Sequence, residues 1–438
     1  MLFSIFYEIL MLLGFIVFFP KALYQAFFHK KYRKSALLRF GFQFPEIQRK
    51  GSGPVFWLHA PSVGETQAIS SVVKRLKEEV KDGTFIISSV TETGHEAAKR
   101  IIPYADYHVF LPFDFYFSVK QVLSRAAPDV VILCETDFWW RFLYEAKKLG
   151  ACAMLVSGKI SENSYKNFKR FHFFAKRLFS LIDFFCLQSD QYKNRFLGLG
   201  IPASKIAVTG NIKGDIKFEP LNTEELSCLR QKLGMAADDL VLVVGSSHDP
   251  EEHLILQEVA PLLQKHKNFK LVIVPRHPNR FSEVEKLIAK SGLESTSWTK
   301  LADLINVHPQ VVLVDTMGVL IHCYQIADFA LVAGSFTERV GGHNILEPCY
   351  FGVPTLCGPY MHSQQQLLDI ALSFGAVVQV DEKSLQSTLQ ELIENKNTRV
   401  VMGKKGLTMM ATLCGATERT IAIGRTLTPH FFSSACVK

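Results

Sequence analysis

Residues 54–67, PVFWLHAPSVGETQ, hold the pattern that decides the fold. The apolar run 54–58 is typical of a buried strand, the Pro-Ser-Val-Gly sequence predicts a turn, and Glu65 then opens a helical pattern. In an open α/β sheet, ligands bind at the carboxyl ends of the strands. Glu65 could therefore take a proton from a bound hydroxyl, or it could simply favour the positive end of a helix from its first turn. This stretch alone leaves both interpretations open.

The alternation of strand and helix patterns continues along the whole chain. Strands are expected at 54–58, 84–90, 129–133, 151–156, 184–187 and 206–209, and then at 240–244, 269–274, 311–314, 329–332, 355–357 and 376–380. Helical patterns include 68–81, 251–265 and 385–395. This alternation predicts an α/β fold with parallel sheets covered by helices. There are too many strands for one doubly wound domain, and residues 210–223 are rich in Gly, Pro and polar residues. We therefore expect two Rossmann-like domains, 41–215 and 216–438, facing a ligand-binding cleft.

The composition narrows the class of protein and its partners. Nine scattered cysteines without a Cys-x-x-Cys pair indicate a reducing compartment and argue against a disulfide framework or a zinc site. The net charge of +8 favours anionic partners. The basic residues are interleaved with an apolar segment rather than with aromatic stacking platforms, which argues against nucleic acid.

The N-terminal segment predicts attachment to a membrane. Residues 2–19 are almost all apolar, with Glu8 as the exception, and a basic cluster follows them (Lys30, Lys31, Arg33, Lys34 and Arg39). A bilayer span needs about 20 apolar residues, so the length is marginal. The basic cluster would keep the following domains in the cytoplasm, and no cleavage site for a signal peptide follows the apolar run. We expect a membrane anchor over 1–40, either a single span or a helix lying in one leaflet.

Loops in the second half of the chain suit recognition of a nucleotide. Arg276 lies between two prolines at a strand end, where a guanidinium can bind phosphate or a planar base. Residues 341–342 are glycines before a helix start, and they would expose backbone amides to an anion. Glu347 could then accept from a ribose diol. Asp249 is expected to cap the helix that follows it, with Glu252 closing a capping box.

Two motifs of the first half have a structural and a functional interpretation. The sequence after the strand 129–133, ETDFWW over 135–140, suits sugar binding, but capping carboxylates and packed aromatic rings would explain it as well. Lys213, at the domain junction, could neutralise a departing phosphate or could be a solvated lysine. No Asp-x-Asp motif follows a strand in the second half, so nothing demands a metal.

Together these motifs resemble the family of 3-deoxy-D-manno-octulosonic acid (Kdo) transferases, membrane-anchored GT-B glycosyltransferases of lipopolysaccharide synthesis. The resemblance extends over nearly the whole chain and is carried by the motifs at 62–65, 135–139, 210–213, 275–278 and 341–348. It implies CMP-Kdo as donor and a lipid A precursor as acceptor. Together with the motifs and the basic N-terminal segment, it leads us to expect an inverting reaction without a metal cofactor, at the inner membrane and facing the cytoplasm.

The resemblance also implies the roles of individual residues. It makes Glu65 the general base, with Glu135 and Lys213 supporting the transition state. Around CMP it places the following residues: Pro275, Arg276, His277, Met317, Gly318, Val319, Gly342, Asn344, Ile345, Leu346 and Glu347. The chain departs from the family pattern at Val319, usually acidic, at Trp140, usually proline, and at 157–159, where Ser-Gly-Lys replaces Asn-Ala-Arg.

Two alternative functions stay open on the sequence alone. A membrane-bound transferase for another nucleotide sugar would share the fold and the base, because a fold does not fix a substrate. A non-catalytic protein that binds a nucleotide or a lipid at the membrane would bind CMP without turnover.

Overall fold

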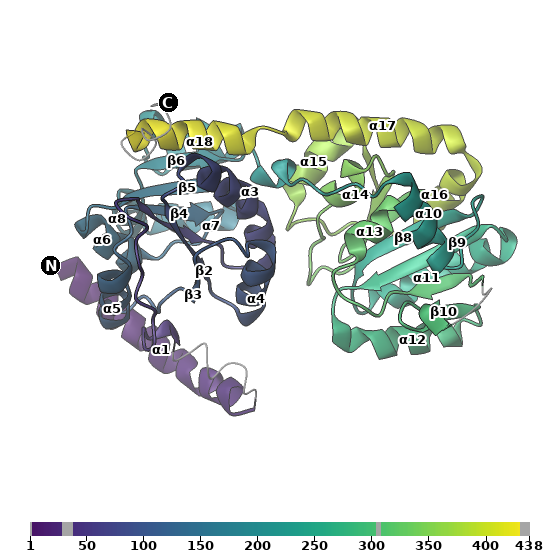
Figure 1. Cartoon of the computed structure of the whole chain (residues 1–438), viewed down its shortest axis with the longest axis horizontal. Coiled ribbons are helices and arrows are strands. Elements are labelled where there is room, and N and C mark those ends of the chain that lie inside the picture. The colour runs from purple at the N-terminus through teal and green to yellow at the C-terminus, as the bar shows by residue number, and fades with distance from the viewer. Residues whose placement is uncertain (1, 29–37, 304–307, 430–438) are drawn as a thin grey trace. The chain divides into compact units, whose positions relative to one another are not determined.

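The computed structural model describes residues 2–28, 38–303 and 308–429, and it divides the chain into two compact units (Figure 1). Unit 1 comprises Met1–Ile216 together with Leu413–Lys438, and unit 2 comprises Lys217–Thr412. The chain thus leaves unit 1 inside the polar region 210–223, and its last segment returns to unit 1.

Unit 1 is a seven-stranded parallel sheet in the order β3-β2-β1-β4-β5-β6-β7. Its elements are α1 (Leu2–Phe28), β1 (Val55–His59), α3 (Val63–Glu79), β2 (Thr84–Ser89), α4 (Glu92–Ile101), β3 (Tyr107–Phe110), α5 (Tyr116–Ala126), β4 (Val130–Cys134), α6 (Trp140–Lys148), β5 (Cys152–Gly158), α7 (Glu162–Arg170), α8 (His172–Phe179), β6 (Phe184–Leu187), α9 (Asp190–Gly198), η1 (Ala203–Lys205), β7 (Ile206–Val208), η2 (Ile212–Asp215) and α18 (Ala416–Leu427).

Alternating side chains of the central strand divide the core of unit 1 into two layers. Val55 and Trp57 of β1 pack in a cluster with α5, α6 and α8. Phe56 and Leu58 point to the opposite face, where α3, α4 and α18 cover the sheet. Strands buried on both faces read as continuous apolar runs, which is why β1 is apolar from Val55 to Leu58.

Unit 2 has a second seven-stranded parallel sheet, in the order β10-β11-β9-β8-β12-β13-β14. Helices α11, α12 and α16 share one apolar cluster with its central strands. Its elements are α10 (Thr223–Lys232), β8 (Leu240–Ser247), α11 (Glu251–Lys265), β9 (Phe269–Pro275), η3 (Pro278–Arg280), α12 (Phe281–Lys290), β10 (Ser295–Ser297), η4 (Lys300–Asp303), β11 (Val311–Leu313), α13 (Leu320–Gln325), β12 (Phe329–Val332), α14 (Leu346–Tyr350), β13 (Thr355–Cys357), α15 (Gln365–Phe374), β14 (Val377–Gln379), α16 (Leu385–Glu394) and α17 (Lys396–Leu413).

The expected strands are confirmed to within a few residues at their ends, and two further strands of the described residues were missed. Both missed strands, β3 and β10, lie at an edge of their sheet. Each is short and partly exposed, so neither produces the continuous apolar run that identifies a central strand.

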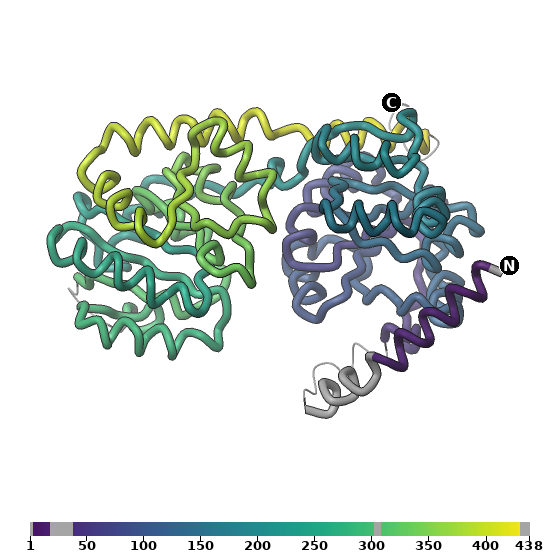
Figure 2. Tube along the Cα trace, turned by 180° about the vertical axis from the view of Figure 1, so that it is seen from behind, coloured from purple at the N-terminus to yellow at the C-terminus, as the bar shows by residue number. Residues whose placement is uncertain are grey.

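Helix α1 belongs to unit 1, and its residues 3–17 lie along the outside of that unit (Figure 2). Phe3 and Met11 are partly buried against the core, and Tyr7 is buried in it. Across the parts of the chain that the structure describes, no helix combines the length and apolarity needed to cross a bilayer. The anchor over 1–40 therefore stays a prediction, and Lys30, Lys31, Arg33 and Lys34 lie outside the described residues.

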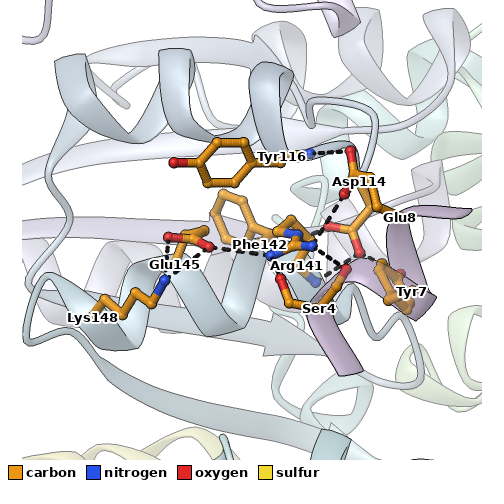
Figure 3. A network of polar contacts seen from close by, with 9 residues as sticks. All are labelled: Ser4, Tyr7, Glu8, Asp114, Tyr116, Arg141, Phe142, Glu145 and Lys148. Atoms are coloured by element: carbon orange, nitrogen blue, oxygen red, sulfur yellow. Dashed lines mark hydrogen bonds and ion pairs between the residues drawn. The ribbon is translucent and has the colours of Figure 1, made fainter. Parts of the chain in front are cut away.

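A buried carboxylate joins α1 to the rest of unit 1. Asp114 accepts hydrogen bonds from the Tyr7 hydroxyl at 2.5 Å and from the backbone N–H groups of Arg141 and Phe142, each at 2.8 Å (Figure 3). Burial raises the pKa of Asp114 to about 6, although these hydrogen bonds oppose the shift.

Two further polar side chains of α1, those of Ser4 and Glu8, contact the rest of unit 1. Arg141 donates to the Ser4 hydroxyl at 2.5 Å and to the Glu8 carboxylate at 3.1 Å (Figure 3). The other Glu8 oxygen accepts from the backbone N–H of Tyr116. Glu8, the exception in the apolar sequence of this segment, is therefore explained by docking of the helix.

We predict that Arg141→Met destabilises unit 1 by about 1.5–3 kcal/mol, because it removes hydrogen bonds between a guanidinium and charged or polar partners. The Arg141 side chain is only 3% exposed, so water cannot replace it easily. Urea unfolding of the full chain, followed by near-ultraviolet circular dichroism, measures the loss. Arg100→Met, at an exposed position of α4, is the control, and equal midpoints for the two variants would contradict the prediction.

Candidate functional site

The predicted catalytic residues of unit 1 meet at the carboxyl edge of its sheet. Strand β1 pairs with both β2 and β4, so the direction of winding reverses between β1 and β4, and ligands bind at such a point. Glu65 lies in the first turn of α3, which follows β1. Glu135 directly follows β4 and has a left-handed backbone, with φ of 64°.

Glu135 is buried between two lysines. Its carboxylate is 1% exposed, with Oε1 2.7 Å from Nζ of Lys213 and Oε2 2.6 Å from Nζ of Lys159. Burial alone would raise the pKa of Glu135, but the two ammonium groups, Lys213 first, hold it below its usual value. Burial would likewise lower the pKa of Lys213, and Glu135 outweighs that effect and raises it. Glu135 and Lys213 are therefore both charged at neutral pH.

The pKa of Glu65 is shifted in the opposite direction to that of Glu135. Burial raises its pKa, and the negative charge of Glu135 raises it further, while Lys213 and Lys159 partly oppose the shift. Its Oε2 atom is buried and has no hydrogen-bond partner among the described residues. Glu65 is thus a carboxylate with raised proton affinity and an unoccupied acceptor atom, as a general base requires.

Lys159 was not among the predicted site residues. It follows β5, which lies beside β4 in the sheet, so its strand-end position was the signal that could have identified it. The departure from the family pattern at 157–159 thus supplies one of the two cations on Glu135.

A second polar chain lies at the same edge. His59, the last residue of β1, is fully buried, and its Nε2 atom is 2.8 Å from Oδ2 of Asp137. Nδ1 of His59 is 2.9 Å from the Ser88 hydroxyl. Burial would raise the pKa of Asp137, but its hydrogen bond with His59 helps to keep it lowered. This chain fixes the loop after β4, which also bears Glu135.

The two tryptophans of this loop have separate surroundings. Trp140 is buried and packs on α1, with its ring centroid 4.8 Å from that of Phe3 and 4.9 Å from that of Tyr7. It therefore helps to hold α1 in place, in line with the structural interpretation. The Trp139 ring lies 5.9 Å from the guanidinium carbon of Arg39, which follows the N-terminal segment.

The carboxyl edge of the sheet in unit 2 gathers the predicted donor loops. Strand β8 pairs with both β9 and β12, so the winding reverses there as well. Pro275 ends β9, and Arg276 follows it with its backbone N–H bonded to the Ser247 carbonyl. His277 is exposed. Arg276 forms no ion pair among the residues that the structure describes.

The start of α11 differs from the prediction. Helix α11 begins at Glu251, Pro250 occupies the cap position without a side-chain bond, and Asp249 caps nothing. Glu252 does not close a capping box: it accepts from Arg280 at 2.9 Å and from the Ser247 hydroxyl at 3.3 Å. The expected motif fails because both glutamates are buried and bind partners outside the helix.

Glu251 joins the loops that follow β8 and β12. Its Oε1 atom accepts from the backbone N–H of His248 at 2.8 Å and of Gly334 at 2.5 Å, and its Oε2 atom accepts from that of Phe336 at 3.2 Å. Burial raises the pKa of Glu251 to about 7 against the effect of these bonds.

The two glycines before α14 do not present free amides. The N–H of Gly341 donates to the Thr337 carbonyl, and that of Gly342 donates to the Gly334 carbonyl at 2.8 Å. Both glycines have left-handed φ angles, and a Cβ atom on Gly342 would lie 2.2 Å from the Met361 sulfur. Glycine is therefore required here by the turn and by packing. The expected anion site on these amides is not present in this form.

The residues after these glycines divide into packed and accessible side chains. Ile345 and Leu346 are buried in the core, so only their backbones can reach a ligand. Asn344 accepts from the Leu346 N–H, and its amide nitrogen lies 3.5 Å from Glu347. Burial raises the pKa of Glu347 to about 7. Because α14 has only five residues, its dipole contributes little.

The loop before α13 holds the remaining predicted donor residues. Met317 is 45% exposed, and Gly318 has a φ of 88° with open space where a Cβ would lie. Val319 caps α13 through its backbone alone. This loop can therefore contact a ligand by its backbone, without the acidic side chain usual in the family.

The chain resembles known proteins over almost its whole length. Residues 35–216 match the family described as 3-deoxy-D-manno-octulosonic-acid transferase (kdotransferase). The 3-deoxy-D-manno-octulosonic acid transferase of Chlamydophila psittaci is 36% identical over 99% of this chain and 97% of its own. That of Haemophilus influenzae is 27% identical over 89% and 91%.

A solved structure supports the fold. The UDP-GlcNAc 2-epimerase from Neisseria meningitidis, bound to UDP-GlcNAc, has a TM-score of 0.58 over 84% of this chain and 98% of its own, at 16% identity. That likeness indicates a GT-B-like fold, with two parallel-sheet α/β domains. With 36% identity to a transferase over nearly its full length, the chain belongs to the Kdo transferase family of glycosyltransferases.

Proposed function

We propose that this enzyme transfers Kdo from CMP-Kdo to a lipid A precursor in lipopolysaccharide biosynthesis, with inversion at the anomeric carbon. The observation that carries the mechanism is the pair of glutamates at the carboxyl edge of the sheet in unit 1. One is held ionised between Lys159 and Lys213, and the other, Glu65, has a raised pKa and an unoccupied oxygen. The names of the relatives support Kdo as the sugar.

In this proposal Glu65 acts on the acceptor. Its free Oε2 takes the proton of the acceptor hydroxyl while that oxygen forms the new bond to the anomeric carbon of Kdo. The bond from that carbon to the phosphate oxygen breaks, and CMP leaves from the opposite face with the electron pair. Direct displacement of this kind needs one base and room on the attacking side, as in inverting glycosidases. No metal ion is needed for the proton transfer.

Glu135 and its lysines support Glu65 through their charges. The negative charge of Glu135 raises the proton affinity of Glu65, and the two ammonium groups limit that increase. Lys213 is nearly buried, so its charge acts in surroundings of low dielectric and has a large effect on nearby anions.

Unit 2 would bind the donor through groups at the carboxyl edge of its sheet. Arg276 is an unpaired cation there among the described residues and suits the phosphate. Glu347 and Asn344 suit the ribose hydroxyls, and the backbone at Met317 and Gly318 is accessible to the rest of CMP.

The transfer and the base are tested together with purified enzyme, CMP-Kdo and a lipid A precursor. We predict a product heavier by whole Kdo units in mass spectrometry, and a rate for Glu65→Gln that is about two to four orders of magnitude lower because the base is lost. Glu78→Gln, on the exposed face of the same helix, is the control. CMP-sialic acid and UDP-sugars, offered separately, identify another donor. Transfer at a normal rate by Glu65→Gln would overturn the role of this residue.

The pH dependence tests the charges around Glu65. Lys159 lowers the pKa of Glu65, so Lys159→Met raises that pKa further. Since the base must be ionised, activity increases with pH through its pKa, and the acid limb of kcat/KM should move to higher pH in this variant. Activity should thus fall most at the acidic end. Lys99→Met, at an exposed position of α4, should leave the profile unchanged, and an unshifted limb in Lys159→Met would contradict the proposal.

We also propose that α1 attaches the enzyme to the cytoplasmic face of the inner membrane, where the lipid acceptor lies. Its outward side chains are apolar and each is more than half exposed: Ile5, Phe6, Ile9, Leu10, Leu12, Leu13, Ile16 and Val17. Its polar residues Ser4 and Glu8 bind unit 1 instead. A helix with one apolar face can lie within a single leaflet, and this favours the interfacial alternative over a span.

We predict that Phe6→Glu combined with Leu13→Glu reduces binding of the full chain to vesicles containing phosphatidylglycerol by at least about tenfold, because two apolar side chains no longer enter the bilayer. Co-sedimentation measures the bound fraction. Val400→Glu with Leu407→Glu introduces the same charges at exposed apolar positions of α17 and should leave binding unchanged. Equal binding by both double variants would refute attachment through α1.

A further inference from the structure

Two histidines of unit 2 share a hydrogen bond that the mechanism above does not use. The Nε2 atom of His248, which follows β8, lies 2.8 Å from the Nε2 atom of His343, in the loop before α14. The ring planes are 13° apart. At this distance one nitrogen donates a proton and the other accepts it.

The number of protons on the pair follows from its surroundings. Burial lowers the pKa of His248 to about 4 and that of His343 to about 3, and neighbouring cations add to both shifts. Both rings are therefore neutral at pH 7, and each carries one N–H. One N–H occupies the bond between the rings. The other must be on Nδ1 of the accepting ring, where it is available to a ligand.

The charges around the pair favour an anion. The groups that act on the two rings are the cations Arg276, Arg339 and Arg280 and the imidazole of His277. Arg280 is already paired with Glu252 at 2.9 Å. Arg276 and Arg339 form no ion pair among the residues that the structure describes. These cations can attract an anion to this edge of the sheet, where the charge of Arg276 also acts on the buried carboxyl of Glu347.

The donors that the sequence predicted for such an anion are occupied. The N–H groups of Gly341 and Gly342 donate to backbone carbonyls within the loop. Side chains can supply hydrogen bonds to a phosphate in place of these two amides, and the cations that act on both rings include Arg276.

The pair is held in place before any ligand binds. The buried carboxylate of Glu251 fixes the backbone of His248 and of Gly334 at once. A Cβ atom on Gly334 would lie 2.6 Å from the ring of His343, so glycine at this position makes room for the ring. Such preorganisation lowers the cost of ordering the site on binding.

We propose that His248 and His343 form part of the donor site and present one imidazole N–H to the phosphate of the donor nucleotide. The accepting ring donates this N–H, and the other ring is a positioning residue that fixes its tautomer. This inference rests on the proposed function, because it takes the donor to be a nucleotide sugar. It adds a phosphate contact beyond Arg276.

The test compares CMP with cytidine, which lacks the phosphate, by calorimetry on the full chain. Loss of a hydrogen bond to a charged group weakens binding by about 10- to 100-fold. We expect His248→Leu and His343→Leu to lose CMP affinity to this extent and to bind cytidine as the unmodified enzyme does. His253→Leu, at an exposed position of α11, should bind both ligands normally.

Glutamine separates the two roles within the pair. Its amide reaches the position of Nε2, where it can donate to the neighbouring ring, but it has no counterpart of Nδ1–H. Glutamine should therefore restore CMP affinity to within about threefold at the positioning histidine and not at the donating one. This asymmetry is not expected from a merely structural role, and it decides the question even where a leucine variant fails to fold.

Three results would overturn the inference: cytidine affinity that falls as much as CMP affinity, leucine variants that bind CMP normally, or glutamine that restores affinity at both positions or at neither. Failure of the proposed function gives a different pattern. If the unmodified enzyme binds CMP but transfers no Kdo, only the function is wrong. If it does not bind CMP at all, the assigned donor and this contact are both wrong.

Discussion

The parallel direction of every strand is the constraint on which both candidate sites depend. Parallel strands end at the same edge of a sheet, so the residues that follow them gather there whatever their distance in sequence. In unit 1 this brings Glu65, Glu135 and Lys159 to one edge from the ends of β1, β4 and β5. In unit 2 it brings His248 beside His343 through the adjacent strands β8 and β12.

Buried carboxylates set the charges and hold the loops at the carboxyl edges of the two sheets. An ionised carboxylate out of contact with water must be paired or hydrogen-bonded, and the chain meets this need in two ways. Glu135 is paired with two ammonium groups and stays charged, which sets the electrostatic surroundings of Glu65. Asp114 and Glu251 are bound by backbone N–H groups and keep raised pKa values. These two carboxylates hold elements together and contact no predicted substrate group.

The sequence predicts the fold better than it predicts the hydrogen bonds of the sites. Apolar runs identified the central strands because burial on both faces requires apolar side chains. The edge strands β3 and β10 are partly exposed and lack such runs, so they were not predicted. The position of Glu65 at a helix start was confirmed. The cap expected at Asp249 is wrong because Glu251 and Glu252 bind partners outside the helix. The amides expected to be free at Gly341 and Gly342 already donate to carbonyls of their own loop. A local pattern shows which groups are available, and only tertiary packing decides which are already bound.

The departure from the family pattern at Lys159 shows how that packing permits a change of residue. An arginine can bind both oxygens of a carboxylate with its planar fork, whereas a lysine acts as a compact point charge. In this chain each oxygen of Glu135 has its own cation: Lys213 contacts Oε1, and Lys159 contacts Oε2. One oxygen is already taken by Lys213, so a fork at position 159 would compete for it, and a single ammonium is sufficient. The charge on Glu135 is therefore kept, and with it the raised proton affinity of Glu65, although the residue that pairs with it differs.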